Sequence, residues 1–329
     1  MDQANWNNLT VNDIETVAPK ALKRLWSISD VHVDYKENWE HLVCLSDSRY
    51  QQDMLIVAGD ATDDLGKLAQ LFECLASKFE SVSFVPGNHE LWLRDTEASR
   101  LLGSASTIKL NTSIDKFHAI CALAEQYSIT TCPVRFGHDA NALWVVPLFS
   151  WYDGPDQTEH SLYLEKKGVE DRTQEMWSDF HLTKWPAEFA QGRTSPSKFF
   201  SGLNHSVCAQ TFDAPVVSFS HFLPRQELML STKLERAASD LNYVDPHPEF
   251  NFSHVAGSAR IEKQLRTLGS KLHIYGHQHR NRFREIEGVT YVSHCMGYPK
   301  ERAKGHVVDD ATHPLLIWDT ANGFNGLSE

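Results

Sequence analysis

Five short motifs in this chain combine carboxylates, an amide and imidazoles, which are side chains that hold divalent metal ions. In chain order they are Asp30-Val31-His32, Gly59-Asp60-Ala61-Thr62-Asp63, Gly87-Asn88-His89-Glu90, Ser220-His221 and Gly276-His277-Gln278-His279. Oxygen ligands together with neutral imidazoles suit Mn, Fe or Zn better than an ion that prefers thiolates. The 17 histidines of the chain point the same way, because imidazole is the commonest metal ligand in proteins.

Each motif follows a stretch that is predicted to be a buried strand. In open α/β sheets, ligands bind outside the carboxyl ends of the strands, so we expect the five motifs to converge on one site. Alternate residues of an extended strand point to the same side. We therefore expect Asp30 and His32 to point together, and likewise His277 and His279.

The elements that position these motifs alternate along the chain. Apolar runs predict strands at residues 25–33, 54–58, 82–85, 143–149, 216–219, 272–275, 289–293 and 315–318. Apolar residues at helical spacing predict helices near 65–79 and 114–124. This alternation indicates an α/β fold.

The chain length of 329 residues allows one large domain or two small ones. We expect an N-terminal polar segment at residues 1–22 and one domain at 23–329. Residues 153–210 are rich in Trp, Glu, Lys, Ser and Pro, so we expect an insertion over the core, with helical fragments near 168–181 and 198–211. A long segment between core strands is more often functional than idle.

Composition excludes several classes of protein. A net charge of −12 without a basic run argues against a nucleic-acid-binding protein. The longest apolar stretch, residues 142–152, is too short to span a membrane. The six cysteines are scattered and the N-terminus lacks an apolar signal core, so we expect a cytoplasmic protein; an organelle protein that has lost its presequence is the alternative. Oligomeric state is left open.

Taken in this order, the five motifs resemble those of the calcineurin-like metallophosphoesterase superfamily. The resemblance spans residues 30–279 and implies a four-layer αββα sandwich, in which two mixed β-sheets pack face to face between outer helices. It also implies two divalent metal ions. The first would be held by Asp30, His32, Asp60 and His279, and the second by Asp60, Asn88, His221 and His277, so that Asp60 bridges the pair.

The resemblance further implies the roles of two residues that hold no metal. His89 would donate a proton to the leaving group, and Asp63 would orient His89. The implied reaction is in-line attack on a phosphate ester by a hydroxide that bridges the two ions. Two ions supply about +4 where the phosphate binds, which explains how an acidic chain could take an anionic substrate.

The chain departs from the Ser/Thr protein phosphatases of the superfamily. Those enzymes follow Gly-Asp-x-x-Asp with Arg-Gly, whereas Asp64 stands at the arginine position here. Membership of that branch is therefore in doubt. Arg225, four residues after His221, is a candidate replacement cation, with a surface arginine as the alternative.

Other candidate substrate contacts lie around the predicted pocket. Trp151 and Tyr152 follow a predicted strand end and are candidates to line the pocket, with core packing as the alternative. Asn88 is a candidate substrate contact as well as a metal ligand. Residues 298–302, Tyr-Pro-Lys-Glu-Arg, either close the site or form a solvated turn.

These features favour a phosphomonoesterase that acts on a small phosphorylated molecule. The first alternative is a phosphodiesterase for a cyclic nucleotide or another diester. The same metal core serves both reactions, and the difference would lie in the pocket formed by residues 90–215. The second alternative is a catalytically silent scaffold, which is disfavoured because His89 and all seven expected ligands are present.

Overall fold

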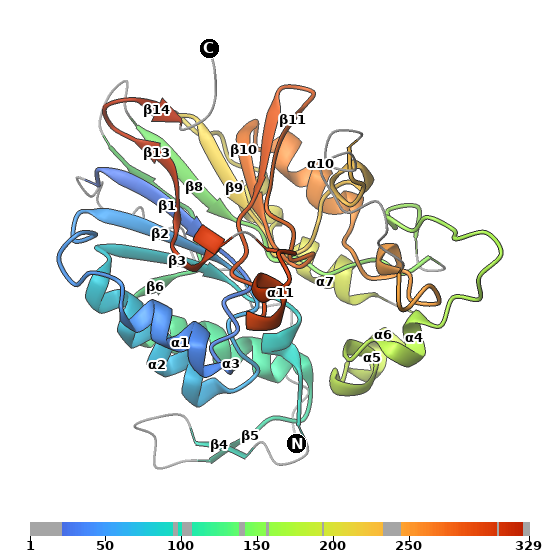
Figure 1. Ribbon diagram of the computed structural model, residues 1–329. Coiled ribbons are helices and arrows are strands. Elements are labelled where there is room, and N and C mark those ends of the chain that lie inside the picture. Colours follow the sequence, from blue (N-terminus) through green and yellow to red (C-terminus); the bar gives the residue numbers. More distant parts are fainter. Residues whose placement is uncertain are drawn as a thin grey trace.

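The computed structural model describes residues 22–94, 98–100, 107–137, 142–155, 158–192, 194–232, 245–307 and 309–324 (Figure 1). Two six-stranded mixed sheets form the centre of the fold, and helices lie on their outer sides. This arrangement confirms the expected four-layer α/β sandwich. Most of the expected N-terminal polar segment, residues 1–21, lies outside the described residues.

The first sheet has the strand order β14-β13-β1-β2-β3-β6. Its parallel strands are β1 (Arg24–Ile28), β2 (Asp53–Ala58), β3 (Ser81–Val85) and β6 (Ile129–Thr130). Its antiparallel strands are β13 (Leu315–Asp319) and β14 (Gly323–Phe324). Helices α1 (Lys36–Val43), α2 (Leu65–Lys78) and α3 (Ser113–Gln126) lie along one face (Figure 1). Every residue of β2 is buried, which explains its unbroken apolar run.

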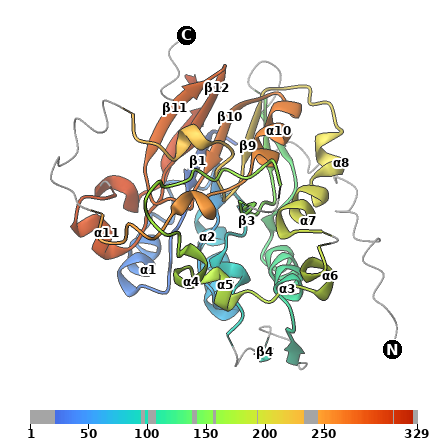
Figure 2. The same cartoon turned by 90° about the vertical axis from the view of Figure 1, so that its right-hand side faces the viewer.

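The second sheet has the strand order β11-β12-β10-β9-β8-β7. Its parallel strands are β8 (Leu143–Pro147), β9 (Val216–Phe219), β10 (Ser270–Tyr275) and β12 (Val289–Ser293). The edge strands β7 (Val134–Phe136) and β11 (Arg282–Ile286) are antiparallel. Helices α7 (Pro196–Leu203), α8 (His205–Cys208) and α10 (Ala259–Thr267) lie together beside this sheet (Figure 2). Strands β4 (Ala98–Arg100) and β5 (Thr107–Lys109) form a separate ribbon.

Side-chain caps mark the starts of the longer helices. Thr112 and Asp115 form a capping box at α3, and the Ser258 hydroxyl accepts a backbone N–H at α10. At α2, the Asp64 carboxylate accepts the Lys67 N–H. The residue at the arginine position of the protein phosphatases therefore serves here as a helix cap.

The segment 153–210 is built from short helices that contact several parts of the core. They are α4 (Thr173–Met176), α5 (Asp179–Leu182), α6 (Ala187–Ala190), α7 and α8, so the expected helical fragments are present but broken into shorter pieces. Backbone hydrogen bonds link this segment to Leu93 and to Ser113. Short helical turns elsewhere are η2 (His89–Leu91), η4 (Gln226–Leu228), η5 (Phe252–His254), α11 (Pro299–Ala303) and η6 (Asp309–Thr312). Within the described parts of the chain, no helix is long and apolar enough to cross a membrane.

Candidate metal centre

Left-handed turns, and not extended strands, aim the expected ligands at one another. The backbone φ is positive at Asp30 (50°), His32 (38°), Asp60 (54°), His277 (71°) and His279 (50°). Such values are uncommon outside glycine and persist where the surrounding structure enforces them, often at functional sites. Strand β1 ends before Asp30, so the expectation that alternation along a strand pairs these side chains is wrong.

Backbone contacts join the ligand-bearing loops to one another. The Asp30 N–H donates to the Gly59 carbonyl (2.9 Å), and the His32 N–H donates to the Asp60 carbonyl (3.1 Å). A Cβ added at Gly276 would lie 2.6 Å from Asp30 Oδ2, so only glycine permits this approach of the loops. The loops therefore form one closely packed unit.

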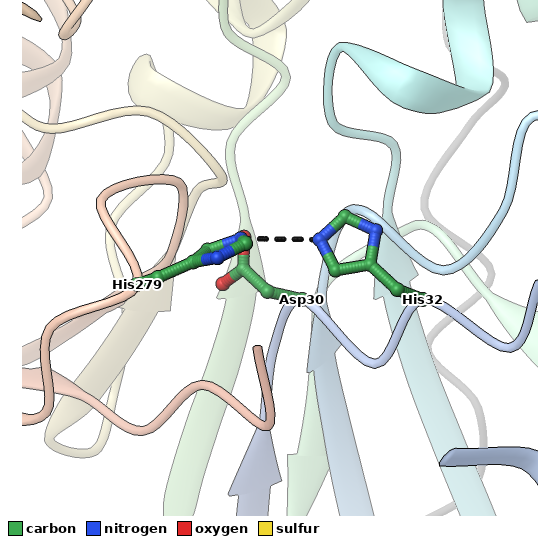
Figure 3. A group of neighbouring side chains, drawn as sticks. All are labelled: Asp30, His32 and His279. Carbon is green, nitrogen blue, oxygen red and sulfur yellow. Dashed lines mark hydrogen bonds and ion pairs between the residues drawn. The ribbon is translucent and has the colours of Figure 1, made fainter. Parts of the chain in front are cut away.

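The first cluster of ligand atoms comes from Asp30, His32 and His279 (Figure 3). The Nε2 atoms of His32 and His279 lie 3.1 Å apart, and Asp30 Oδ1 lies 3.3 Å from His279 Nε2. All three ligand atoms lie within 4.8 Å of one another. Two imidazole nitrogens and one carboxylate oxygen that converge in this way fit a borderline divalent ion.

The second cluster comes from Asp60, His221 and His277. His221 Nε2 lies 3.4 Å from Asp60 Oδ2 and 3.2 Å from Asn88 Oδ1, so the Asn88 oxygen belongs with this cluster. A third, overlapping group of His32, Asp60 and His89 lies between the two clusters. The structure thus brings all seven expected ligands together, with Asp60 in the position expected of a bridging ligand.

Hydrogen bonds at the second ring nitrogen orient three of the four ligand imidazoles. His221 Nδ1 (2.9 Å), His277 Nε2 (3.0 Å) and His279 Nδ1 (2.7 Å) each contact an acceptor. The acceptors, in that order, are the Ala58 carbonyl, the Val255 carbonyl and the Glu301 carboxylate. An N–H that donates on one side leaves the other nitrogen free to bind a metal, which is the usual arrangement of histidine ligands.

Electrostatics show how the clusters balance their charge when no cation is bound. Burial lowers the pKa of His277 to about 3, and the nearby His221 adds to the shift. Burial also opposes the charged form of His221 and His279, but Asp60 and Asp30 outweigh it and raise their pKa values to about 9 and about 10. Protonated imidazoles thus compensate the buried carboxylates, and a bound cation would replace these protons.

His89 lies at the open side of the centre. Its side chain is 15% exposed, and its imidazole packs on the Trp92 ring with the centroids 3.7 Å apart. Its backbone N–H donates to Asp60 Oδ1 (3.0 Å). Partial exposure beside the ligand clusters is compatible with the expected role of proton donor, which stays a prediction.

Asp63 does not make the contact that we expected. Its Oδ2 accepts the Arg94 Nε–H (2.7 Å), and its side-chain hydrogen bonds in the described part of the chain do not include His89. Because the described partner of the carboxylate is an arginine on the neighbouring loop, the expected orienting role of Asp63 finds no support in this geometry. The rings that contact His89 belong to Trp92 and His32.

Glu90 is a structural residue of the site to which sequence reasoning assigned no role. Its buried carboxylate accepts the backbone N–H groups of Asp60, Ala61, Thr62 and Gly87. Burial and the Asp60 charge raise its pKa to about 7. Its place at the end of the Gly-Asn-His-Glu motif is the sequence feature that could have indicated a role in the site. Two further residues contact ligand side chains: Asp179, which belongs to no recognisable motif, and Glu301, which lies in the 298–302 segment.

Arg225, the candidate replacement cation, is paired with carboxylates in this structure. Its guanidinium pairs with the carboxylates of Glu227 (2.7 Å), Glu262 (3.2 Å) and Glu287 (2.9 Å). Three carboxylates around one guanidinium compensate its charge and occupy its donors. The candidate role of Arg225 in binding phosphate therefore finds no support in this geometry.

Trp151 and Tyr152 follow the core-packing alternative. Both are buried, and the Trp151 ring contacts Trp185, Phe200 and Phe222. Tyr152 packs on Phe222 as well, and burial together with the nearby Asp179 carboxylate raises its pKa well above the usual range. Both rings contact Phe222, and the Phe222 ring in turn packs against the ligand His277.

The segment 298–302 closes over the first cluster. The Tyr298 ring packs against His32 and His279, with centroid distances of 4.5 and 4.8 Å. Glu301 holds His279 Nδ1 from the same segment. Of the two alternatives for these residues, the structure supports closure of the site.

Comparisons with known proteins agree with this geometry. The sequence pattern of the calcineurin-like phosphoesterase family matches residues 23–281. The acyl-carrier-protein phosphodiesterase PptH of Mycobacterium tuberculosis is 24% identical over 285 residues, which cover 84% of this chain and 78% of the relative. The crystal structure of phosphopantetheinyl hydrolase (PptH) from Mycobacterium tuberculosis matches the fold with a TM-score of 0.63 and 21% identity, covering 91% of this chain and 96% of that chain. This chain therefore belongs to the calcineurin-like phosphoesterase family and is a hydrolase that acts on phosphate ester bonds.

Proposed function

We propose that the chain is a two-metal phosphodiesterase that removes the phosphopantetheinyl group from a carrier protein. The observation that carries the proposal is the pair of adjacent ligand clusters that meet at Asp60, with His89 on the open side. The name of the PptH relative supplies the substrate class. The comparison favours the phosphodiesterase alternative over the phosphomonoesterase for a small substrate that we expected first.

The donor set fits two borderline divalent ions. Asp30, His32 and His279 would hold one ion, and His221, His277 and Asn88 would hold the other, with Asp60 shared. When bound, a pair of such ions acidifies water and clamps the attacking and leaving oxygens of an in-line displacement. Mn, Fe and Zn all suit these ligands.

His89 is the residue that we assign to the leaving group. A phosphopantetheinyl group is joined to a serine oxygen through phosphorus. In hydrolysis, a water oxygen bonds to phosphorus, the bond from phosphorus to the serine oxygen breaks, and the His89 imidazolium protonates that oxygen. The serine hydroxyl and phosphopantetheine are the products, and the proton given by His89 is regained from the attacking water.

Two positions considered for a phosphate-binding arginine also favour a diester over a monoester. Arg225 is occupied by three carboxylates, and Asp64 caps a helix where protein phosphatases place an arginine. A monoester dianion gains more from such cations than a diester, which carries one negative charge. The absence of a free positive charge at these two positions therefore favours the diester.

Aromatic side chains beside the second cluster suit an apolar arm of the substrate. Trp177 packs against His277 (5.8 Å between centroids) and stacks on Phe250 (5.4 Å). Phe180 of the same segment is exposed. We assign these rings to contacts with the pantetheine chain, since partly exposed aromatic rings favour apolar ligands.

The test is the conversion of a holo-carrier protein to its apo form by the purified, Mn²⁺-loaded protein. Intact-protein mass spectrometry should show loss of the phosphopantetheinyl group, and this loss should stop with EDTA. An aryl diester, an aryl monoester and cyclic nucleotides complete the substrate panel. Faster hydrolysis of the monoester, with no change in the carrier protein or the diesters, would contradict the proposal.

A further inference from the structure

A buried carboxylate from the middle of the 153–210 segment contacts one of the candidate metal ligands. Asp179, at the start of α5, is 1% exposed. Its Oδ1 accepts Asn88 Nδ2–H (2.9 Å) and Trp92 Nε1–H (2.6 Å), while its Oδ2 accepts Trp177 Nε1–H (2.7 Å). Three side-chain N–H groups thus donate to one buried carboxyl group, which fixes the positions of the side chains that carry them.

The first of these bonds fixes the orientation of a metal ligand. An asparagine side chain carries an oxygen that can bind a cation and an NH₂ group that repels one. Because the Asn88 NH₂ group donates to Asp179, its oxygen faces His221 Nε2 in the second cluster (3.2 Å). Asp179 therefore selects the one amide orientation that can bind a metal.

The second bond fixes the surface on which the proton donor rests. The His89 imidazole packs on the Trp92 indole, and the indole N–H is anchored by the same Asp179 oxygen that holds Asn88. Asp63, the residue expected to orient His89, instead contacts Arg94. One carboxylate thus supports both a ligand and the acid.

The segment that carries Asp179 is tied to the same loop by its backbone. The Leu93 N–H donates to the Leu182 carbonyl (2.7 Å), and the Ser113 N–H donates to the Lys184 carbonyl (2.7 Å). These backbone hydrogen bonds hold the segment in place, so that the buried Asp179 carboxylate faces Asn88 and Trp92.

We propose that Asp179 is a positioning residue through which the 153–210 segment sets the metal-binding orientation of Asn88 and the platform of His89. The proposal rests on the proposed two-metal function in that it assigns Asn88 to the second ion. It makes the segment a structural part of the metal centre, in addition to any role in binding substrate.

The first test measures Mn²⁺ binding by the Asp179→Asn variant. Electron paramagnetic resonance reports the concentration of the free ion during the titration. The substitution keeps the shape but puts an NH₂ group against at least one N–H donor. Loss of a carboxylate that supports a ligand typically weakens metal affinity by about 10–100-fold, and we expect this loss at the second ion only. Asp153→Asn is the control, because Asp153 is equally buried at the start of the same segment, but its carboxylate accepts the Ser197 and Ser258 hydroxyls and pairs with Arg260 instead of contacting a ligand. It should bind both ions as the wild type does.

The second test is Trp92→Phe, which keeps an aromatic platform but removes the bond to Asp179. Mn²⁺ binding should stay intact, while turnover should fall more for diesters with an alkyl leaving group than for an aryl diester, because only the poor leaving group needs an acid. A loss of fold alone would lower both equally. This variant also keeps the inference testable if Asp179→Asn does not fold.

The outcomes separate the inference from the proposed function. Wild-type protein that binds no Mn²⁺ would overturn the two-metal function itself. Wild-type protein that binds two ions, together with an Asp179→Asn variant of unchanged affinity, would overturn only the role of Asp179. An equal loss in Asp153→Asn would also overturn that role, because it would trace the effect to general loosening of the segment.

Discussion

His273 is a buried imidazole that should make the stability of this protein fall in mild acid. It is fully buried in β10, with Nδ1 2.8 Å from Ser218 Oγ and Nε2 3.0 Å from Ser220 Oγ. Burial lowers its pKa to about 3. In the unfolded chain the pKa is about 6.5, so only the unfolded state takes up a proton between these values.

Acidification should lower the free energy of unfolding through His273. The folded-state pKa is depressed, so the stabilisation from the neutral imidazole is complete above about pH 6.5 and is lost as the pH falls toward 3. At pH 5 the solution is about 1.5 units below the unfolded pKa, and each unit is worth about 1.4 kcal/mol. His273 should therefore cost about 2 kcal/mol of unfolding free energy at pH 5 relative to neutral pH.

Urea unfolding of metal-free protein at pH 7.5 and pH 5 tests this value, with His273→Gln as the comparison. The variant loses stability at both pH values because its packing changes, but this offset cancels in the difference between them. The other buried histidines contribute equally to both proteins. The wild type should lose about 2 kcal/mol more than the variant on acidification, whereas equal losses would refute the reasoning.

Three further predictions concern the metal centre. Asp60 and Asp30 raise the pKa values of His221 and His279 to about 9 and about 10, so metal binding near pH 7 should release up to two protons and should weaken as the pH falls. Calorimetry in buffers of different ionisation enthalpy counts the released protons. Zero release would contradict the assignment of these two histidines as metal ligands. His89→Ala should lower kcat by about 10²–10⁴-fold for a poor leaving group while both ions remain bound, and unchanged kcat would exclude His89 as the acid. Glu301→Gln should weaken the first ion by about 10–100-fold in an equilibrium Mn²⁺ titration, since it alters the bond to His279 Nδ1; unaltered affinity of both ions would argue against this supporting role.

The sequence predicted the core of the fold because apolar runs are a local pattern, and the ligand set came from the resemblance of five short motifs to those of a known family. The apolar runs at 216–219 and 289–293 became β9 and β12 with the same bounds. Each ligand motif directly follows or closely trails such a run, so the parallel topology was enough to bring the motifs together. The left-handed turns at Asp30 and His277 were not predictable, because only a small share of Asp and His residues adopt a positive φ, although both types do so more often than most others.

The supporting residues could not be predicted because their partners are distant in sequence. Asp179 contacts Asn88 across 91 positions, and no spacing or composition marks the pair. Arg225 was a candidate phosphate-binding cation, with a surface arginine as the alternative, but its ion pair with Glu287, 62 positions away, depends on how β11 and β12 fold back. Such contacts are set by tertiary packing, which local pattern does not encode.

The central claim is that two metal ions held by these loops drive hydrolysis of a phosphodiester. It is tested most directly by titrating metal-free protein with Mn²⁺ while measuring release of phosphopantetheine from a holo-carrier protein. We predict no release without metal and a maximum at two bound ions per chain. Full activity without metal, or no release at any occupancy, would contradict the account.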